Sequence, residues 1–245
     1  FAGTLRSDKS SRFAEEYADD IFPSASIGWV IDKESFFTSS FINSLKLRAS
    51  YGEIGNQSLP ASNPDVNISA LNDNTAFYSF TGDRGQVNTG AALSSVGNPL
   101  LTWETSISTN FGVDFSMMDR KLSGSIEYFT LNTVDLIVRD NSLISSTAID
   151  AGAPFVNKGE VQNTGVDFQI AYGSQTDSGL SYNFDLNVSS YKNEVLSLVG
   201  DAATFGDNFR EGAMTRTAVG EPISHFYGKP SDGLDANGRI NFIDA

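Results

Sequence analysis

Residues 101–117 read LTWETSISTNFGVDFSM, and side chains of two kinds alternate along this stretch without a break. Successive side chains of a β-strand point to opposite faces, so the stretch predicts one long strand with an apolar face and a polar face. It is longer than the roughly 3–10 residues of most strands in soluble proteins. The first face carries Leu101, Trp103, Thr105, Ile107, Thr109, Phe111, Val113, Phe115 and Met117, and the second carries Thr102, Glu104, Ser106, Ser108, Asn110, Gly112, Asp114 and Ser116.

The same two-residue period recurs in five other segments. In each of them an apolar or aromatic stripe faces a stripe of Ser, Asn, Gly, Asp and a few charged residues. The six segments together predict an all-β, antiparallel protein with long strands. The further segments are residues 21–31, 45–52, 122–128, 163–172 and 180–189.

Two architectures fit this pattern, a soluble β-sandwich and a transmembrane β-barrel. The barrel is favoured because the polar stripes are small and amidic, whereas Lys, Glu and Arg usually cover a solvated sheet. The connections also differ in length, with short ones at 117–121 and 173–179 and a moderate one at 32–44. Long ones are expected at 57–99, at 139–156 and after residue 193. Aromatic residues expected near strand ends suit interfacial girdles: Trp29, Tyr51, Trp103, Tyr128 and Tyr172.

Composition excludes several classes of function. The 245 residues carry 30 acidic and 16 basic side chains, a formal charge of −14, and nucleic-acid binding needs a basic face. The chain has no cysteine and one histidine, so thiolate catalysis and a multi-His zinc site are excluded. Ser224 and His225 are adjacent and would point to opposite faces of a strand, which argues against a Ser–His nucleophile. We expect no enzyme activity.

Five strings, in this order along the chain, resemble motifs of the SusC/RagA family of TonB-dependent outer-membrane transporters of Bacteroidota. The resemblance covers essentially the whole sequence, with Lys9 at a position where the family commonly has Gly. The strings are DKSSRF (8–13) with FPSASIGW (22–29), LKLRASYGEIGNQ (45–57), NPLLTWE (98–104), NKGEVQNTG (157–165), and GEPI (220–223) with FYG (226–228) and DG (232–233).

The resemblance implies a fold and a place in a longer chain. The expected fold is an antiparallel up-and-down transmembrane β-barrel of 22 strands, of which this chain is a stretch of the C-terminal half. Residues 1–192 would supply barrel strands, long extracellular loops and short periplasmic turns. Residues 193–245 would form an extracellular region leading to strands that this chain does not contain. The plug and the TonB box would lie elsewhere in the full protein.

The resemblance also implies a function and partners. It implies import of a large nutrient, an oligosaccharide or oligopeptide, across the Gram-negative outer membrane. TonB would act through missing N-terminal parts, a SusD-like surface lipoprotein would cover the mouth, and the lipid bilayer would surround the wall. Two alternatives stay open: a structural barrel subunit of a larger outer-membrane assembly, and a soluble β-rich adhesin or sugar-binding module.

No cofactor is expected, and one pattern makes calcium a candidate ligand. Residues 235–240 read DANGRI and resemble part of an EF-hand loop, with Asp235, Asn237 and Asp244 as the candidate ligands. Gly233 stands where the first ligand would be Asp, and Asp244 where the last would be Glu. A plain Asn-Gly turn explains the same residues.

Exposed aromatic residues in the long connections are the candidates for contact with cargo or a lid. Aromatic rings flanked by amides and carboxylates suit sugars or peptides, because the ring stacks while the polar groups form hydrogen bonds. Packing among the loop's own aromatic residues is the alternative. The candidates are Phe77, Tyr78, Phe80, Phe209, Phe226 and Tyr227.

Overall fold

The computed structural model describes residues 1–58, 70–78, 82, 88–140, 153–199, 204–205, 208–209 and 212–243. Within the elements Ala70–Tyr78 and Asn88–Ser95, and from 204 to 213, most side chains are not described. In the described part of the chain no helix has the length and apolar character needed to cross a bilayer.

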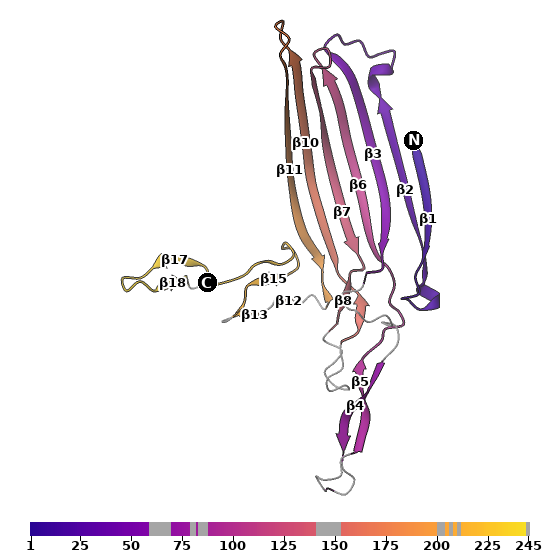
Figure 1. The fold of residues 1–245 in the computed structure, drawn as a ribbon, viewed down its shortest axis with the longest axis vertical. Helices are drawn as coiled ribbons and strands as arrows, with labels where there is room; N and C mark the ends of the chain where they lie inside the picture. The colour runs from indigo at the N-terminus through magenta and orange to yellow at the C-terminus, as the bar shows by residue number, and fades with distance from the viewer. Residues whose placement is uncertain are drawn as a thin grey trace.

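The architecture is one tall antiparallel sheet of seven strands, in the order β1-β2-β3-β6-β7-β10-β11 (Figure 1). Each strand pairs with its neighbours along the chain, as in an up-and-down barrel wall. The strands are β1 Ala2–Lys9, β2 Asp19–Val30, β3 Ile42–Asn56, β6 Glu104–Met117, β7 Leu122–Val134, β10 Glu160–Gln175 and β11 Ser181–Ser197.

The smaller elements lie in the connections. A two-stranded β4–β5 hairpin extends from one end of the sheet, and the C-terminal segment leaves the sheet sideways (Figure 1). The small elements are η1 Glu15–Tyr17, η2 Ile31–Lys33, β4 Ala70–Tyr78, β5 Asn88–Ser95, β8 Ile137–Arg139, β9 Phe155–Asn157, β12 Thr204–Phe205, β13 Asn208–Phe209, β14 Gly212–Ala213, β15 Thr215–Thr217, β16 His225–Phe226, β17 Ser231–Leu234 and β18 Ile240–Phe242.

Strand register gives the sheet its two faces. Opposite residues of an antiparallel pair share a face, so register partners can be followed from strand to strand. One row runs Trp29, Leu47, Val113, Ile126, Phe168, Val188, and the adjacent row on the other face runs Gly28, Arg48, Gly112, Glu127, Asp167, Ser189. The predicted alternation along single strands therefore assembles into an apolar face and a polar face.

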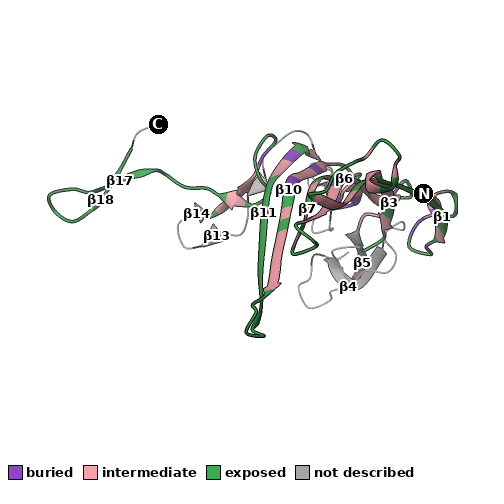
Figure 2. Cartoon of the chain, turned by 90° about the horizontal axis from the view of Figure 1, so that it is seen from above, coloured by how far each residue is buried: buried purple, intermediate pink, exposed green. Residues whose placement is uncertain are grey.

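Most of the sheet is exposed or half-buried, as Figure 2 shows by colour, and many side chains of the apolar face are exposed. Phe111, Ile126 and Val188 are exposed although they are large and hydrophobic. A wall one sheet thick that leaves its apolar face uncovered fits a lipid environment, because a soluble sandwich would bury that face against a second sheet.

The connections sort by length to the two ends of the sheet. The turn 118–121, the hairpin loop 176–180 and the connection 31–41 with η2 lie at one end, and the connections that carry β4–β5 and β8–β9 lie at the other (Figure 1). We call the second end the long-loop end.

Three features differ from the sequence predictions. The sheet has a seventh strand, β1, which no apolar stripe announced because Leu5 is its one large apolar residue. Strand β11 runs to Ser197, beyond the expected boundary at 192/193, because Lys192–Ser197 continues the ladder with β10. Strand β6 begins at Glu104, so Leu101 and Trp103 lie outside it. They are buried, and the prediction that one strand runs from residue 101 is wrong at its first three residues.

Candidate transport wall and loop-end sites

The polar face of the sheet carries an ion-pair network that spans three strands. Arg48 on β3 bonds through Nε to Asp114 on β6, at 3.1 Å, and through Nη1 to Glu127 on β7. To reach β7 the guanidinium passes over Gly112, where an added Cβ would stand 2.6 Å from Arg48 Cζ. A glycine at this position of β6 therefore lets one arginine tie three strands together.

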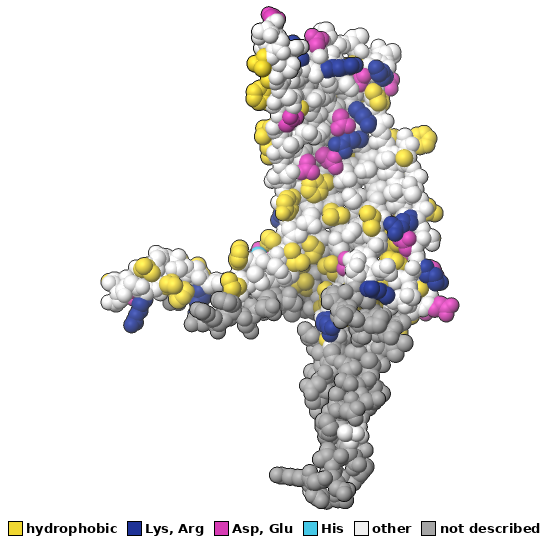
Figure 3. Space-filling view, in the orientation of Figure 1, with side chains coloured by type: hydrophobic (Ala, Val, Ile, Leu, Met, Phe, Trp, Pro, Cys, Tyr) yellow, Lys and Arg dark blue, Asp and Glu magenta, His cyan; other side chains and the backbone are white. Residues whose placement is uncertain are grey.

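The same row holds surplus negative charge. Asp167 on β10 is the register partner of Glu127, and like charges placed opposite each other are unfavourable. Within the described part of the chain Arg48 makes ion pairs with two carboxylates, and Asp167 makes none. Figure 3 shows basic and acidic side chains next to one another on the upper half of the sheet. This side of the wall is charged and hydrogen-bonding, as expected for a water-filled or protein-filled lumen.

Two aromatic residues also stand on the polar face, and the sequence analysis missed them. Phe129 on β7 and Tyr191 on β11 both flank Gly165 on β10, where an added Cβ would lie 2.7 Å from Phe129 Cζ and 2.8 Å from Tyr191 Cβ. Tyr191 is 70% exposed. Glycine at position 165 makes room for the two side chains across the strand between them, a pairing that the alternation within any one strand cannot reveal.

A compact apolar cluster closes the long-loop end. We call it the loop-end cluster, and its rings meet at close range: Trp103 lies 5.4 Å from Phe13 and 5.6 Å from Phe22, centroid to centroid. Trp103 also donates its indole N–H to the carbonyl of Ala18 at 3.2 Å. Its members are Phe13, Phe22, Leu101, Trp103, Ile137 and Phe155, with Tyr17 packed against them.

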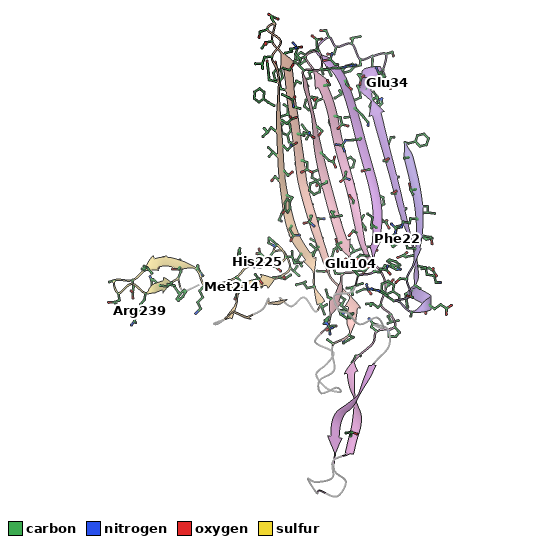
Figure 4. The ribbon with its side chains drawn as sticks, in the orientation of Figure 1. Phe22, Glu34, Glu104, Met214, His225 and Arg239 are labelled. Atoms are coloured by element: carbon green, nitrogen blue, oxygen red, sulfur yellow. The ribbon has the colours of Figure 1, made fainter. Side chains whose placement is uncertain are left out.

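Amide and carboxylate side chains tie the surrounding loops to this cluster. Asn157 receives the N–H of Thr102 and donates to the Thr102 carbonyl, both at 2.8 Å. Asn98 donates to the Phe155 carbonyl at 2.8 Å. Glu104 accepts from Asn56 Nδ2 at 2.9 Å and from the Ile137 N–H at 3.2 Å. In Figure 4, Phe22 and Glu104 mark this end of the sheet. The long loops are therefore anchored at their bases.

The cluster explains the placement of Trp103. The sequence suggested that its ring belongs to an interfacial girdle, but it is 4% exposed, inside the cluster. Trp29, at the other end of the sheet, is exposed and donates its indole N–H to Glu34 at 2.8 Å, and its place in an interfacial girdle stays a prediction. Tyr128 lies in the middle of β7 rather than near its end, so the girdle assignment is wrong for this residue as well.

The predicted contact residues divide into described and undescribed ones. Phe226 is 89% exposed and Tyr227 is exposed, both in the segment that leaves the sheet. Phe77 and Tyr78 belong to β4 and Phe209 to β13, but their side chains lie outside the described set, and Phe80 lies outside the described residues altogether. The role of Phe226 and Tyr227 as contact residues stays a prediction.

The calcium candidates form a turn in the described residues. Asp235 Oδ1 accepts the N–H groups of Asn237 and Arg239, each at 2.8 Å, which closes the tip of the β17–β18 hairpin. Gly238 there has φ +76°, the left-handed conformation that glycine tolerates. Asp244 lies outside the described residues. Among the residues described, no group of three or more His, Cys, Asp or Glu side chains is arranged to hold a metal ion.

An up-and-down antiparallel sheet with one open apolar face, one polar face and its long connections gathered at one end is the wall of an outer-membrane type of β-barrel. Comparisons with known proteins agree. The family described as "TonB dependent receptor-like, beta-barrel" matches residues 1–233. The chain belongs to this TonB-dependent receptor β-barrel family.

Individual relatives place the chain within longer proteins. TonB-dependent receptor P3 of Formosa agariphila is 32% identical over 98% of this chain and 23% of its own length. TonB-dependent receptor SusC of Bacteroides thetaiotaomicron is 27% identical over 98% of this chain and 25% of its own. The chain therefore spans about a quarter of the length of the curated relatives it matches.

Solved structures share the fold. The RagAB peptide importer in its "open-open" state superimposes with a TM-score of 0.79 at 21% identity, over 99% of this chain and 26% of the matched chain. The "closed-closed" state gives a TM-score of 0.76 at 22% identity, over 97% and 26%. The prediction of a SusC/RagA-like barrel from the sequence motifs is confirmed.

Proposed function

We propose that the full protein is a TonB-dependent importer of a large nutrient, an oligosaccharide or an oligopeptide, in the outer membrane of a Gram-negative bacterium. This chain contributes part of the barrel wall and the extracellular loops. The observation that carries the proposal is the two-faced sheet: an open apolar face for lipid, and a polar face lined by Arg48, Asp114, Glu127 and Asp167 for the lumen.

Membership of the family supports a proposal for the energy source and for the partners. A TonB-dependent receptor takes its energy through TonB, and we propose that TonB contacts parts of the protein that precede this chain. We also propose a SusD-like surface lipoprotein as the lid, since the chain resembles SusC and RagA. The long-loop end, with the loop-end cluster holding the loop bases, is the side that would face such a lid.

Uptake measurements in the native bacterium test the proposal. Three strains are compared on defined oligosaccharide and oligopeptide libraries: the parent, a strain lacking the full-length gene, and a strain lacking TonB. Import by the parent that is lost in both deletion strains supports the proposal, and the library member that is lost identifies the cargo class. Unchanged uptake in both deletion strains would contradict it. Loss of outer-membrane integrity without loss of any import would favour the structural-subunit alternative.

A further inference from the structure

The segment that leaves the sheet contains an arginine whose bonding is incomplete. Arg216 lies on β15, and its Nε is buried without a hydrogen-bond partner among the described residues. Burying an N–H of a guanidinium without an acceptor is costly. The described residues also include no carboxylate within ion-pair distance of Arg216, although the whole chain has a charge of −14.

The guanidinium of Arg216 is held by an aromatic ring. Its Cζ lies 5.3 Å from the centroid of the Tyr227 ring, within the range of a cation–π contact. The backbone explains this placement, because the Tyr227 N–H bonds to the Met214 carbonyl at 2.9 Å and so continues the β15–β16 ladder. Stacking restrains the plane of the guanidinium, so less freedom is lost when it binds a ligand.

His225 is the second polar group on the same face. It is the register partner of Arg216, and opposite residues of an antiparallel pair share a face. Its Nδ1 lies 3.1 Å from the Pro222 carbonyl, to which it donates, and this leaves Nε2 without a partner among the described residues. Figure 4 shows His225 beside Met214 in the segment between the sheet and the C-terminal hairpin, with Arg239 at the far end of that hairpin.

The acidic side chains of the β17–β18 hairpin form hydrogen bonds within that hairpin. Asp235 caps the hairpin tip through the Asn237 and Arg239 N–H groups, and Asp232 accepts from Asn241 Nδ2 at 2.7 Å. The planar fork of an arginine can hold a carboxylate through its two Nη groups with two parallel N–H···O bonds, which leaves the buried Nε out of that contact. We infer that Arg216, stacked on Tyr227 and opposite His225, binds a carboxylate group of the cargo. The assignment of the carboxylate to cargo rests on the proposed import function.

Binding to the purified full-length transporter with its partners tests this inference. The probes are two matched pairs: trialanine against trialanine amide, and trigalacturonate against neutral galactotriose. We expect the protein to bind the acid of at least one pair about 10- to 100-fold more tightly than its neutral counterpart, the scale of hydrogen bonds to a charged group. The pair that shows the preference tells whether the carboxylate belongs to a peptide or to a sugar acid.

Variants of two arginines in the same segment give the control. Arg216→Gln should abolish the preference for the acid, and Arg216→Lys should weaken it about tenfold, because lysine keeps the charge but lacks the fork. Arg239→Gln, on the exposed hairpin, should leave the preference unchanged. If Arg216→Gln does not fold, as judged by heat-modified gel mobility, the lysine variant decides.

Equal binding of acid and neutral probes in both pairs would overturn the inference. So would an undiminished preference in a folded Arg216→Gln protein, or in the lysine variant when the glutamine variant does not fold. The binding assay needs no TonB, whereas the uptake assay does. Unchanged uptake in both deletion strains, together with intact acid binding, would therefore count against the proposed function and leave the Arg216 site in place.

Discussion

In the seven-stranded sheet, neighbouring strands share long registers, such as the ladder that runs from Ile42↔Met117 to Asn56↔Glu104 between β3 and β6. The loop-end cluster is built differently, from single residues that five separate segments bring together. In the sheet a side chain has its main neighbours at the register positions of the two adjacent strands, so one substitution affects a few local contacts. In the cluster each ring is held by partners far away in the sequence, so one change loosens several loops at once.

The largest effect is expected in the loop-end cluster, where adjacent leucines provide a matched pair. Leu101 is fully buried and Leu100 is 66% exposed. Leu101→Ala should lower the free energy of unfolding of the full-length protein in detergent by about 2–5 kcal/mol. Leu100→Ala should change it by less than about 0.5 kcal/mol. Urea unfolding followed by tryptophan fluorescence measures both, and equal losses would mean that the cluster is not a packing unit.

The next effect distinguishes the two faces of the sheet. Phe111 is 56% exposed on the apolar face, and Ser108 lies on the polar face of the same strand. If position 111 is near the bilayer midplane, Phe111→Arg should cost about 2–4 kcal/mol in folding into lipid vesicles, and Ser108→Arg much less. Folding yields of the two variants in vesicles provide the comparison. A larger penalty at Ser108 would reverse the assignment of the faces.

Glycines beneath long side chains give a smaller and graded effect. An added Cβ at Gly165 would lie 2.7 Å from the carbonyl oxygen of Ser190, a backbone atom that cannot move aside, whereas at Gly112 it would meet only the flexible end of Arg48. We expect Gly165→Ala to destabilise by about 1–3 kcal/mol and Gly112→Ala by less than about 1 kcal/mol. Thermal unfolding of both variants checks this order. A larger loss at Gly112 would show that the Arg48 network is the stiffer of the two contacts.

The smallest effect is a pH dependence of stability at the end of the sheet opposite the long-loop end. The pKa of Asp32 is lowered, chiefly because Asp32 Oδ1 accepts the Leu45 N–H at 2.9 Å. A carboxyl whose pKa is lower in the folded state stabilises the fold above its unfolded pKa of about 3.9. That contribution is lost as the pH falls through the folded pKa.

Heat resistance as a function of pH measures this contribution. The difference between the parent and Asp32→Asn should be present at neutral pH and should vanish in acid. Asp177→Asn, in the exposed turn between β10 and β11, is measured beside it as the control for replacing one surface carboxylate by an amide. A difference at Asp32 that persists unchanged into acid would contradict the role of its ionised form.

The comparison of the two regions also explains which features could be predicted from the sequence. The period of two is a property of one strand, so the segments around Phe111, Val166 and Leu186 were identified from their own residues. Trp103 keeps the same parity, but the paired strand begins only at Glu104, and the Trp103 ring packs in the cluster. The alternation of apolar and polar residues alone does not show at which residue strand pairing begins or ends.

Features that depend on the register between strands could not be predicted from the sequence. The position of Phe129 and Tyr191 around Gly165, and of Arg48 across Gly112, follows from which residues stand opposite each other in three strands. The isolated Gly residues in otherwise regular strands were the available signal, because a glycine inside a strand often marks a close approach. Arg216 had no comparable signal, since its partner Tyr227 comes from a later short strand.

The most direct test of the central claim, that one face meets lipid and the other a polar lumen, is thiol labelling of the full-length protein in native membranes. The parent chain segment has no cysteine, so single cysteines can be placed at 111, 113 and 126 on the apolar face and at 108, 110 and 125 on the polar face. A membrane-impermeant maleimide should label the second set, and the first set should stay protected until the membrane is dissolved. Labelling of the first set with protection of the second would contradict the account.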